Sequence, residues 1–222
     1  MTMRFFVLER KPTGADASGR TDVMQEEGFT VGEAPRCSTC GGFIGMLKWL
    51  PPYRVEIDAW GDHFGDFAFG GGCEWLLISE RFRRIYERSG LKGFSGFDPV
   101  EVTKLTRHNK SLRGDPPQYF KVDVVRSQSA VDQAASGFEW SEGASICPVC
   151  LIPKQGIIKR WSGVVIRSQS WQGEDVFLPC GGGELVSTSR FKELCEASKV
   201  TNAVFVPAEN YSHDYSPWEQ PR

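Results

Sequence analysis

Two short cysteine motifs carry the clearest chemistry in this sequence: Cys37-Ser-Thr-Cys40 and Cys147-Pro-Val-Cys150. A Cys-x-x-Cys turn presents two thiolates from one tight loop, and Zn²⁺ takes four such ligands in a tetrahedron. Each pair therefore suits half of a structural zinc site. Gly41 follows the first pair and permits a tight turn beneath a metal, whereas Leu151 follows the second.

Two other interpretations of the cysteine pairs remain open. In the first, the pairs have lost their metal and are simply buried or able to form disulfides; in the second, one pair is redox-active. Redox-active pairs stand at the start of a helix, where the helix dipole lowers the thiol pKa. The residues after the two pairs, Gly41-Gly42 and Leu151-Ile-Pro153, do not favour a helix start, so we prefer the zinc interpretation.

The composition predicts a folded protein. The chain has 222 residues, of which 40% are hydrophobic and 24% charged, with a formal net charge of −2; this near-neutral charge gives no global sign of a nucleic-acid or membrane partner. The start of the chain lacks the apolar core of a signal peptide. Cysteine pairs in a chain without a secretion signal are typical of a reducing compartment, so we expect a cytoplasmic protein.

The sequence also repeats itself. Short motifs recur in the same order at a nearly constant offset of about 110 residues, as expected for two diverged copies of one module. The matching motifs are the two cysteine pairs, Val55–Ala59 with Val164–Ile166, Gly70–Gly72 with Gly181–Gly183, and Ser79–Leu91 with Thr188–Val200.

The repeated motifs predict the same elements in each copy. Alternating apolar residues predict strands at 55–59 and 164–166. The segments beginning at Ser79 and Thr188 predict helices, because each starts with a good N-cap residue and has apolar side chains at helical spacing. Further strands are expected at 5–8 and 119–124.

We therefore predict an α+β fold made of two copies of a strand–CxxC knuckle–strand–helix–strand module, mostly antiparallel and related by a pseudo-twofold axis. The turn Gly114-Asp-Pro-Pro117 marks the boundary. The first repeat then spans residues 1–113 and the second 114–222, packed as one compact body, with a flexible tail at 212–222.

A pseudo-twofold axis would let the two knuckles complete one site. On this hypothesis Cys37, Cys40, Cys147 and Cys150 bind a single structural zinc. Cys73 and Cys180 flank the glycine triplets and are further candidate ligands, although small buried residues fit them better. Cys195 falls on the apolar stripe of its predicted helix, which indicates core packing.

Nothing in the sequence predicts catalysis. The three histidines, His63, His108 and His213, do not stand at metal-ligand spacings. The glycine triplets lack the lysine and hydroxyl residue of a phosphate-binding loop. We therefore expect a binding protein and not an enzyme.

The motifs together resemble those of the myxobacterial double-CXXCG family. The resemblance is carried by the two cysteine pairs, the first strand Phe5–Glu9, the two helices with an Arg-Phe start, and the segment Asn202–Tyr211. It implies an immunity protein, an antitoxin that binds and neutralises a toxin delivered between kin cells, such as a nuclease. Only the first pair reads CXXCG, since Leu151 replaces the second glycine.

An immunity protein gains fast association from charge complementary to its toxin, and nuclease toxins are cationic around the nucleic-acid groove. The acidic residues that would provide a matching face here are Glu56, Asp58, Asp62, Asp66, Glu174 and Asp175.

The main alternative is a zinc-ribbon-type protein that binds nucleic acid through residues 81–113. This window holds nine Lys or Arg against three acidic residues, a charge of +6. The second copy does not repeat the basic pattern, because Arg83-Arg84 becomes Lys192-Glu193, so we do not expect nucleic acid as the partner. A CxxC oxidoreductase is a third reading, and it requires a thiol with a lowered pKa.

Overall fold

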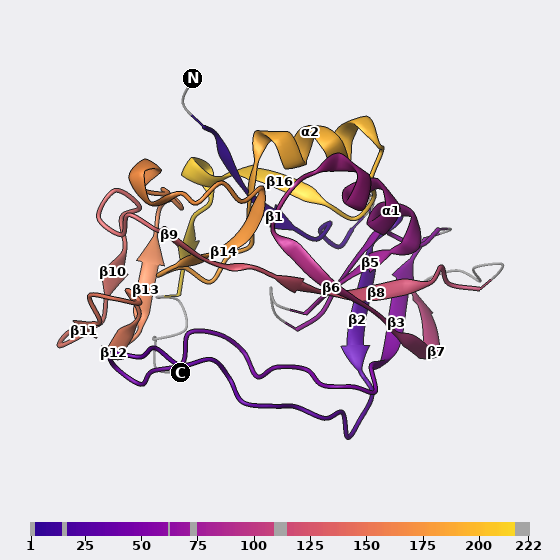
Figure 1. Cartoon of the computed structure of the whole chain (residues 1–222), viewed down its shortest axis with the longest axis horizontal. Coiled ribbons are helices and arrows are strands. Elements are labelled where there is room, and N and C mark those ends of the chain that lie inside the picture. Colours follow the sequence, from indigo (N-terminus) through magenta and orange to yellow (C-terminus); the bar gives the residue numbers. More distant parts are fainter. Residues whose placement is uncertain (1–2, 15–16, 62, 72–74, 109–114, 216–222) are drawn as a thin grey trace.

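The computed structural model describes residues 3–14, 17–61, 63–71, 75–108 and 115–215. Its larger sheet has seven strands in the order β6-β8-β5-β4-β2-β3-β7 (Figure 1). In chain order these are β2 (Thr21–Gln25), β3 (Arg54–Trp60), β4 (Phe67–Phe69), β5 (Leu76–Ser79), β6 (Phe94–Pro99), β7 (Glu101–His108) and β8 (Tyr119–Val124).

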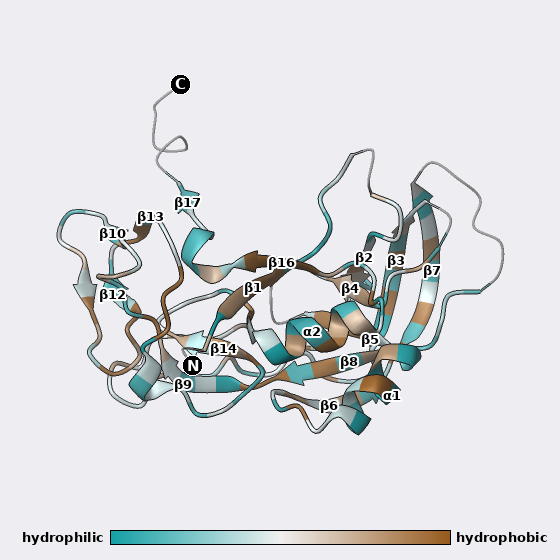
Figure 2. Ribbon diagram, turned by 90° about the horizontal axis from the view of Figure 1, so that it is seen from above, coloured by the Kyte–Doolittle hydropathy of each residue, from teal (hydrophilic) through white to brown (hydrophobic). Residues whose placement is uncertain are grey.

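A second sheet has five strands in the order β16-β1-β15-β14-β9. In chain order these are β1 (Phe5–Glu9), β9 (Arg126–Ala130), β14 (Val176–Cys180), β15 (Val186–Thr188) and β16 (Val204–Pro207). Figure 2 shows this sheet between the seven-stranded sheet and a group of short strands at the other end of the molecule.

The short strands form two small sheets. They are β10 (Glu139–Trp140), β13 (Ile158–Trp161) and β17 (His213–Asp214) in one sheet, and β11 (Ser145–Ile146) and β12 (Pro153–Gln155) in the other. Strand β17 belongs to the segment 212–222 that we predicted as a tail, and its His213 pairs with Trp161 of β13.

The predicted strand at 55–59 is confirmed as β3, where Val55, Ile57 and Ala59 are buried on one face. The predicted strand at 164–166 is wrong. Val164 and Ile166 are buried, but the segment makes only an isolated bridge between Val131 and Ile166. Two apolar residues at alternate positions can be buried by neighbouring segments without forming a hydrogen-bonded strand ladder. The alternation in the sequence is the same in both cases, which explains the error.

Both predicted helices are confirmed, α1 at Glu80–Ser89 and α2 at Ser189–Ala197. Ser79 caps α1 by accepting a hydrogen bond from the backbone N–H of Phe82 at 3.2 Å, and Thr188 caps α2 through Phe191 at 3.4 Å. The helices contact each other in a core shared by both large sheets, where the Phe82 and Phe191 rings lie 6.1 Å apart. Two 3₁₀ turns, η1 (Ser168–Ser170) and η2 (Ala208–Asn210), complete the set.

The first strand of each predicted repeat pairs with strands of the other repeat. Strand β1 lies between β15 and β16, and strand β8 lies between β5 and β6. The pairs Phe5–Thr188 and Tyr119–Ser79 begin these ladders at the two helix caps. The two segments are therefore joined through both sheets.

The α+β class is confirmed, with two α-helices and a majority of strands. The sheets are mixed, because the pairings β3–β7, β2–β4 and β9–β14 are parallel while the other ladders of the described residues are antiparallel.

Candidate metal centre and adjoining pocket

The first cysteine motif is a turn closed by two backbone hydrogen bonds. The N–H of Gly41 donates to the carbonyl of Cys37 at 2.8 Å, and the N–H of Cys37 donates to the carbonyl of Gly42 at 2.9 Å. Gly41 has a φ of 70°, a left-handed conformation that glycine adopts without steric cost.

The second motif has the same two bonds. The N–H of Leu151 donates to the carbonyl of Cys147 at 2.9 Å, and the N–H of Cys147 donates to the carbonyl of Ile152 at 3.0 Å. Leu151 takes a φ of 59° although it is not glycine. Its carbonyl accepts a bond of 2.6 Å from the side-chain amide of Gln133, which helps to hold the strained position.

The two turns bring four sulfur atoms together. The Sγ atoms of Cys37, Cys40, Cys147 and Cys150 all lie within 4.8 Å of one another. Across the two motifs, the sulfurs of Cys37 and Cys147 are 4.0 Å apart and those of Cys40 and Cys150 are 3.8 Å apart. A zinc tetrahedron with Zn–S bonds near 2.3 Å has sulfur–sulfur edges of about 3.8 Å, and a disulfide needs about 2.0 Å. The arrangement is compatible with one four-thiolate zinc site.

The backbone around the sulfurs favours thiolate, the form that binds metal. The N–H groups of Cys150 and Val149 lower the pKa of Cys147 to about 6, and those of Cys40 and Thr39 lower the pKa of Cys37. Burial raises the pKa of the Cys150 thiol to about 12. A cation among the sulfurs would supply the charge needed to ionise the Cys150 thiol.

The remaining described cysteines lie outside this cluster. The Cys180 thiol lies 3.5 Å from the carbonyls of Val149 and Cys150, so it contacts the second knuckle through its backbone. Cys195 is buried in the core on α2, as its sequence position predicted. Cys73 lies outside the described residues. Neither cysteine pair begins a helix, which disfavours the redox-active interpretation.

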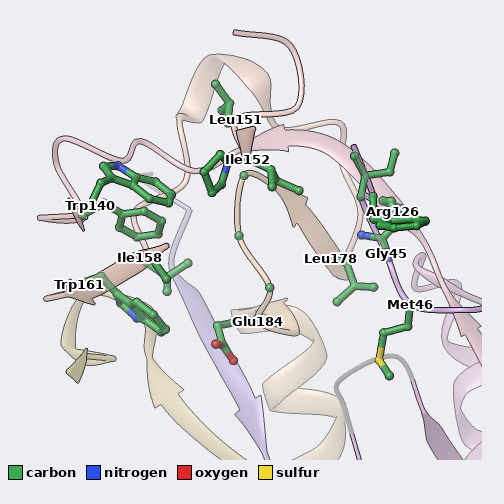
Figure 3. A pocket seen from close by; sticks show the side chains of 18 of the residues that line it. Gly45, Met46, Arg126, Trp140, Leu151, Ile152, Ile158, Trp161, Leu178 and Glu184 are labelled. Carbon is green, nitrogen blue, oxygen red and sulfur yellow. The ribbon is translucent and has the colours of Figure 1, made fainter. Parts of the chain in front are cut away.

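A pocket of about 410 Å³ opens beside the knuckles (Figure 3). One wall is aromatic, formed by Trp140 and Trp161 around Ile158, and Leu151 and Ile152 lie above it. The opposite side carries Arg126, Gly45 and Met46, with Glu184 at the base. The sequence-based prediction missed this pocket, because its walls come from seven separate segments of the chain. The sequence carried no signal for it, since aromatic residues are about as dense in residues 138–161 as in the chain as a whole.

Glu184 is the acidic residue of this pocket. Burial raises the pKa of its carboxyl, although the Tyr211 hydroxyl, 3.3 Å away, opposes the rise. The same hydroxyl lies 3.0 Å from the Glu9 carboxylate. The Tyr211 hydroxyl therefore lies within hydrogen-bond distance of both carboxylates.

Two of the six acidic residues that we predicted to bind a partner are buried inside the fold. Asp66 is 5% exposed and accepts hydrogen bonds from the Ser79 hydroxyl at 2.7 Å and from Arg81 at 2.9 Å. Asp175 is 1% exposed and accepts a 3.0 Å bond from the Thr188 hydroxyl. Both carboxylates hold helix caps in place, so they are unsuited to an accessible face.

Three of the other four acidic residues, Glu56, Asp58 and Glu174, are partly exposed. Glu56 and Asp58 lie on the face of β3 opposite the buried residues, and Glu56 forms a 2.8 Å ion pair with Lys104. Glu174 accepts a 2.7 Å hydrogen bond from the Ser127 hydroxyl. Asp62 lies outside the described residues. The structure therefore does not gather the six residues on one face.

The basic window 81–113 is partly neutralised within the fold. Ion pairs join four of its cations to carboxylates, namely Arg81 to Asp66, Arg83 to Glu87, Arg84 to Glu80 and Lys104 to Glu56. Residues 109–114 lie outside the described residues. The pairing lowers the positive potential that nucleic-acid binding needs.

No helix among the described residues has the length and apolar character of a membrane span.

A comparison of the chain with curated proteins gives no match. Residues 61–210 match the family model described as Immunity protein family (Imm11), a segment that includes both helices and the second knuckle. Since the match covers more than half of the chain, this protein belongs to that immunity protein family.

Proposed function

We propose that this protein neutralises a cognate toxin in the cytoplasm by binding it, without catalysing a reaction. The observation that carries the proposal is the family match over residues 61–210. The fold suits such a role, because the interleaved β1 and β8 strands make a rigid body that has little conformational entropy to lose on binding.

We further propose that the two halves are diverged copies related by a pseudo-twofold axis. Matching contacts support it. The Asp66 carboxylate accepts a 2.9 Å bond from the N–H of Thr201, after α2, and the Asp175 carboxylate accepts a 3.1 Å bond from the N–H of Lys92, after α1. Each half therefore binds the chain that leaves the other half's helix.

The metal in this proposal is one zinc ion bound by Cys37, Cys40, Cys147 and Cys150. The sulfur geometry and the partly buried side chains of Ile44 and Ile152 that pack against the cysteines support it. Such an ion cross-links two loops that are more than a hundred residues apart in the chain, so its role is structural.

The test is co-expression with the product of the gene immediately upstream in the native operon. We expect the neighbour alone to stop growth, and this protein to restore growth and to co-purify with the neighbour as a complex. A toxic neighbour that this chain neither rescues nor binds would contradict the proposal for that pair.

A cationic toxin, such as a nuclease, is the partner that the acidic hypothesis favours. The burial of Asp66 and Asp175 leaves Glu56, Asp58 and Glu174 as the described candidates, and Glu56 and Asp58 share one face of β3. Replacing both by lysine should slow toxin association about tenfold or more at low salt. An unchanged association rate would exclude this face.

Nucleic-acid binding is the alternative function. The basic window would then give a steep fall in affinity with rising salt. We expect no such salt-dependent binding to DNA or RNA, because four cations of the window are in ion pairs.

A further inference from the structure

We propose that the pocket beside the knuckles is the docking site for a toxin segment that inserts a large apolar side chain and places an acidic group opposite Arg126. This inference rests on the proposed immunity function and names the surface that carries it. The alternative acidic face lies on β3, in the other sheet.

The first observation is the construction of the pocket. Its volume of about 410 Å³ falls in the range of ligand-binding cavities and can hold an aromatic side chain. Residues that follow both knuckles line it, including Phe43 after the first and Ile152 after the second. The proposed metal site therefore fixes the relative position of two of its walls.

The second observation is a concentration of exposed apolar side chains. Phe43, at 55% exposure, and Tyr215, at 40%, line this pocket. Val149, at 53%, and Leu47, at 48%, line two adjoining hollows that share Arg126 with it. A concentration of exposed apolar side chains of this kind marks an interaction site, and Trp, Tyr and Arg are the residue types that dominate binding energy.

The third observation is the charge around the pocket. Arg126 lines all three hollows, and Arg36 and Lys48 line their outer parts. The Arg36 guanidinium lies 3.9 Å from the Phe43 ring centroid, so cationic and apolar groups are presented together. Glu33 and Glu184 are the acidic residues among the same linings. The excess of cations favours a partner segment with an acidic residue beside its apolar anchor.

The experiment measures binding of the purified full chain to the purified product of the neighbouring gene by calorimetry. Two variants alter the pocket, the double replacement Phe43→Ala with Trp140→Ala, and Arg126→Glu. The matched control is Met24→Ala, which removes a 57% exposed apolar side chain on β2 that does not line the pocket. Metal content and melting temperature of every variant establish that it is folded.

We expect each pocket variant to weaken toxin binding about 30-fold or more while the control stays within about threefold. Binding by folded pocket variants that equals wild type would overturn the inference and leave the immunity function intact. If wild type itself does not bind the toxin, the proposed function fails instead. Sedimentation of the same samples tests whether a second copy of this chain occupies the pocket. A wild-type dimer that the pocket variants abolish would assign the surface to that second copy and contradict the inference.

Discussion

The two cysteine knuckles have the same backbone and different residues at its most demanding position. In both, the residue after the second cysteine has a left-handed φ and donates its N–H to the carbonyl of the first cysteine. That residue is Gly41 in one knuckle and Leu151 in the other. A leucine in this conformation costs about 1 kcal/mol, so some other interaction must stabilise the second turn.

The space around Leu151 shows where that stabilisation arises. Its side chain lines the apolar pocket, and a Cβ added at Gly181 would lie only 2.5 Å from the Cβ of Leu151. Gly181 itself has a left-handed φ of 78°. In the second knuckle, the glycine therefore stands opposite Leu151 in this contact and not at position 151 itself. The position after the second cysteine therefore keeps the same backbone conformation in both knuckles, while its side chain is free to acquire a packing role.

The largest effect expected is the loss of the zinc ion that we propose the two knuckles share. Cys147→Ser should reduce bound zinc from one ion per chain to about a tenth of that, and should lower the unfolding free energy by several kcal/mol. The reason is that a missing thiolate leaves three ligands and two untied loops. Metal analysis by mass spectrometry together with thermal unfolding measures both.

Cys180→Ser is the matched control, because Cys180 contacts the second knuckle but lies outside the sulfur cluster. Equal zinc loss in this control would show that the four-cysteine assignment is incomplete.

The two helix caps also differ between the halves, in the contacts of the carboxylate beside each cap. Asp66 binds Arg81 through two nitrogens and also binds Thr201, whereas the contact of Asp175 with Arg190 is a single one of 3.4 Å. We expect Asp66→Ala to cost about 3 kcal/mol and Asp175→Ala about 2 kcal/mol. Denaturant unfolding measures the difference, and a larger loss for Asp175→Ala would reverse our ranking of the two caps.

The Asp66 cap also predicts a dependence on acid. Burial raises the pKa of Asp66, but hydrogen bonds from Arg81, Ser79 and Thr201 outweigh it and hold the pKa below its usual value. The folded-state pKa is therefore below the unfolded value near 3.9, so this stabilisation is present above about pH 4 and lost as the pH falls through the folded pKa.

Asp66→Asn should therefore be less stable than wild type at neutral pH and should lose less stability between pH 5 and the most acidic pH at which both are folded. Parallel unfolding curves across that range measure it. If wild type and variant lose stability equally, the carboxylate is not the source of the acid sensitivity.

The sequence predicted the local elements well where a short motif determines the structure. The N-caps Ser79 and Thr188, the strand 119–124 and the approach of the two cysteine pairs all depend on a few neighbouring residues or on a repeated motif. Val164–Ile166 was misread because burial by distant segments produces the same alternation as a sheet.

The sequence could not predict which strands exchange or what lies beside the knuckles. Nothing local specifies that β1 inserts between β15 and β16, since the pairing partners are about 180 residues away. The same holds for the burial of Asp66 and Asp175, whose carboxylates look like ordinary surface charges until the caps of Ser79 and Thr188 are in place.

A smaller effect isolates the backbone cost in the first knuckle. A Cβ added to Gly41 would meet no atom within 4 Å, so Gly41→Ala changes the conformational cost without a clash. We expect a loss of about 1 kcal/mol, equivalent to a fall of roughly 3 °C in melting temperature, with zinc retained. Gly143→Ala, also left-handed with open space but outside the knuckles, is the control and should lose a similar amount. A much larger loss at Gly41 would mean that the metal site amplifies the strain.

The smallest effect, and the sharpest test of the comparison, is the reciprocal change Leu151→Gly. Relief of the left-handed strain stabilises the second knuckle by about 1 kcal/mol, and loss of leucine packing together with the added chain entropy of glycine removes a similar amount. The net change in stability should therefore be below about 1 kcal/mol, although the residue sits next to a metal ligand. The replacement deletes a pocket wall, so toxin affinity should fall while zinc content stays at one ion per chain. If stability rises by the full strain energy and toxin affinity is unchanged, Leu151 contributes neither packing nor toxin binding. Leucine at this position would then only strain the second knuckle.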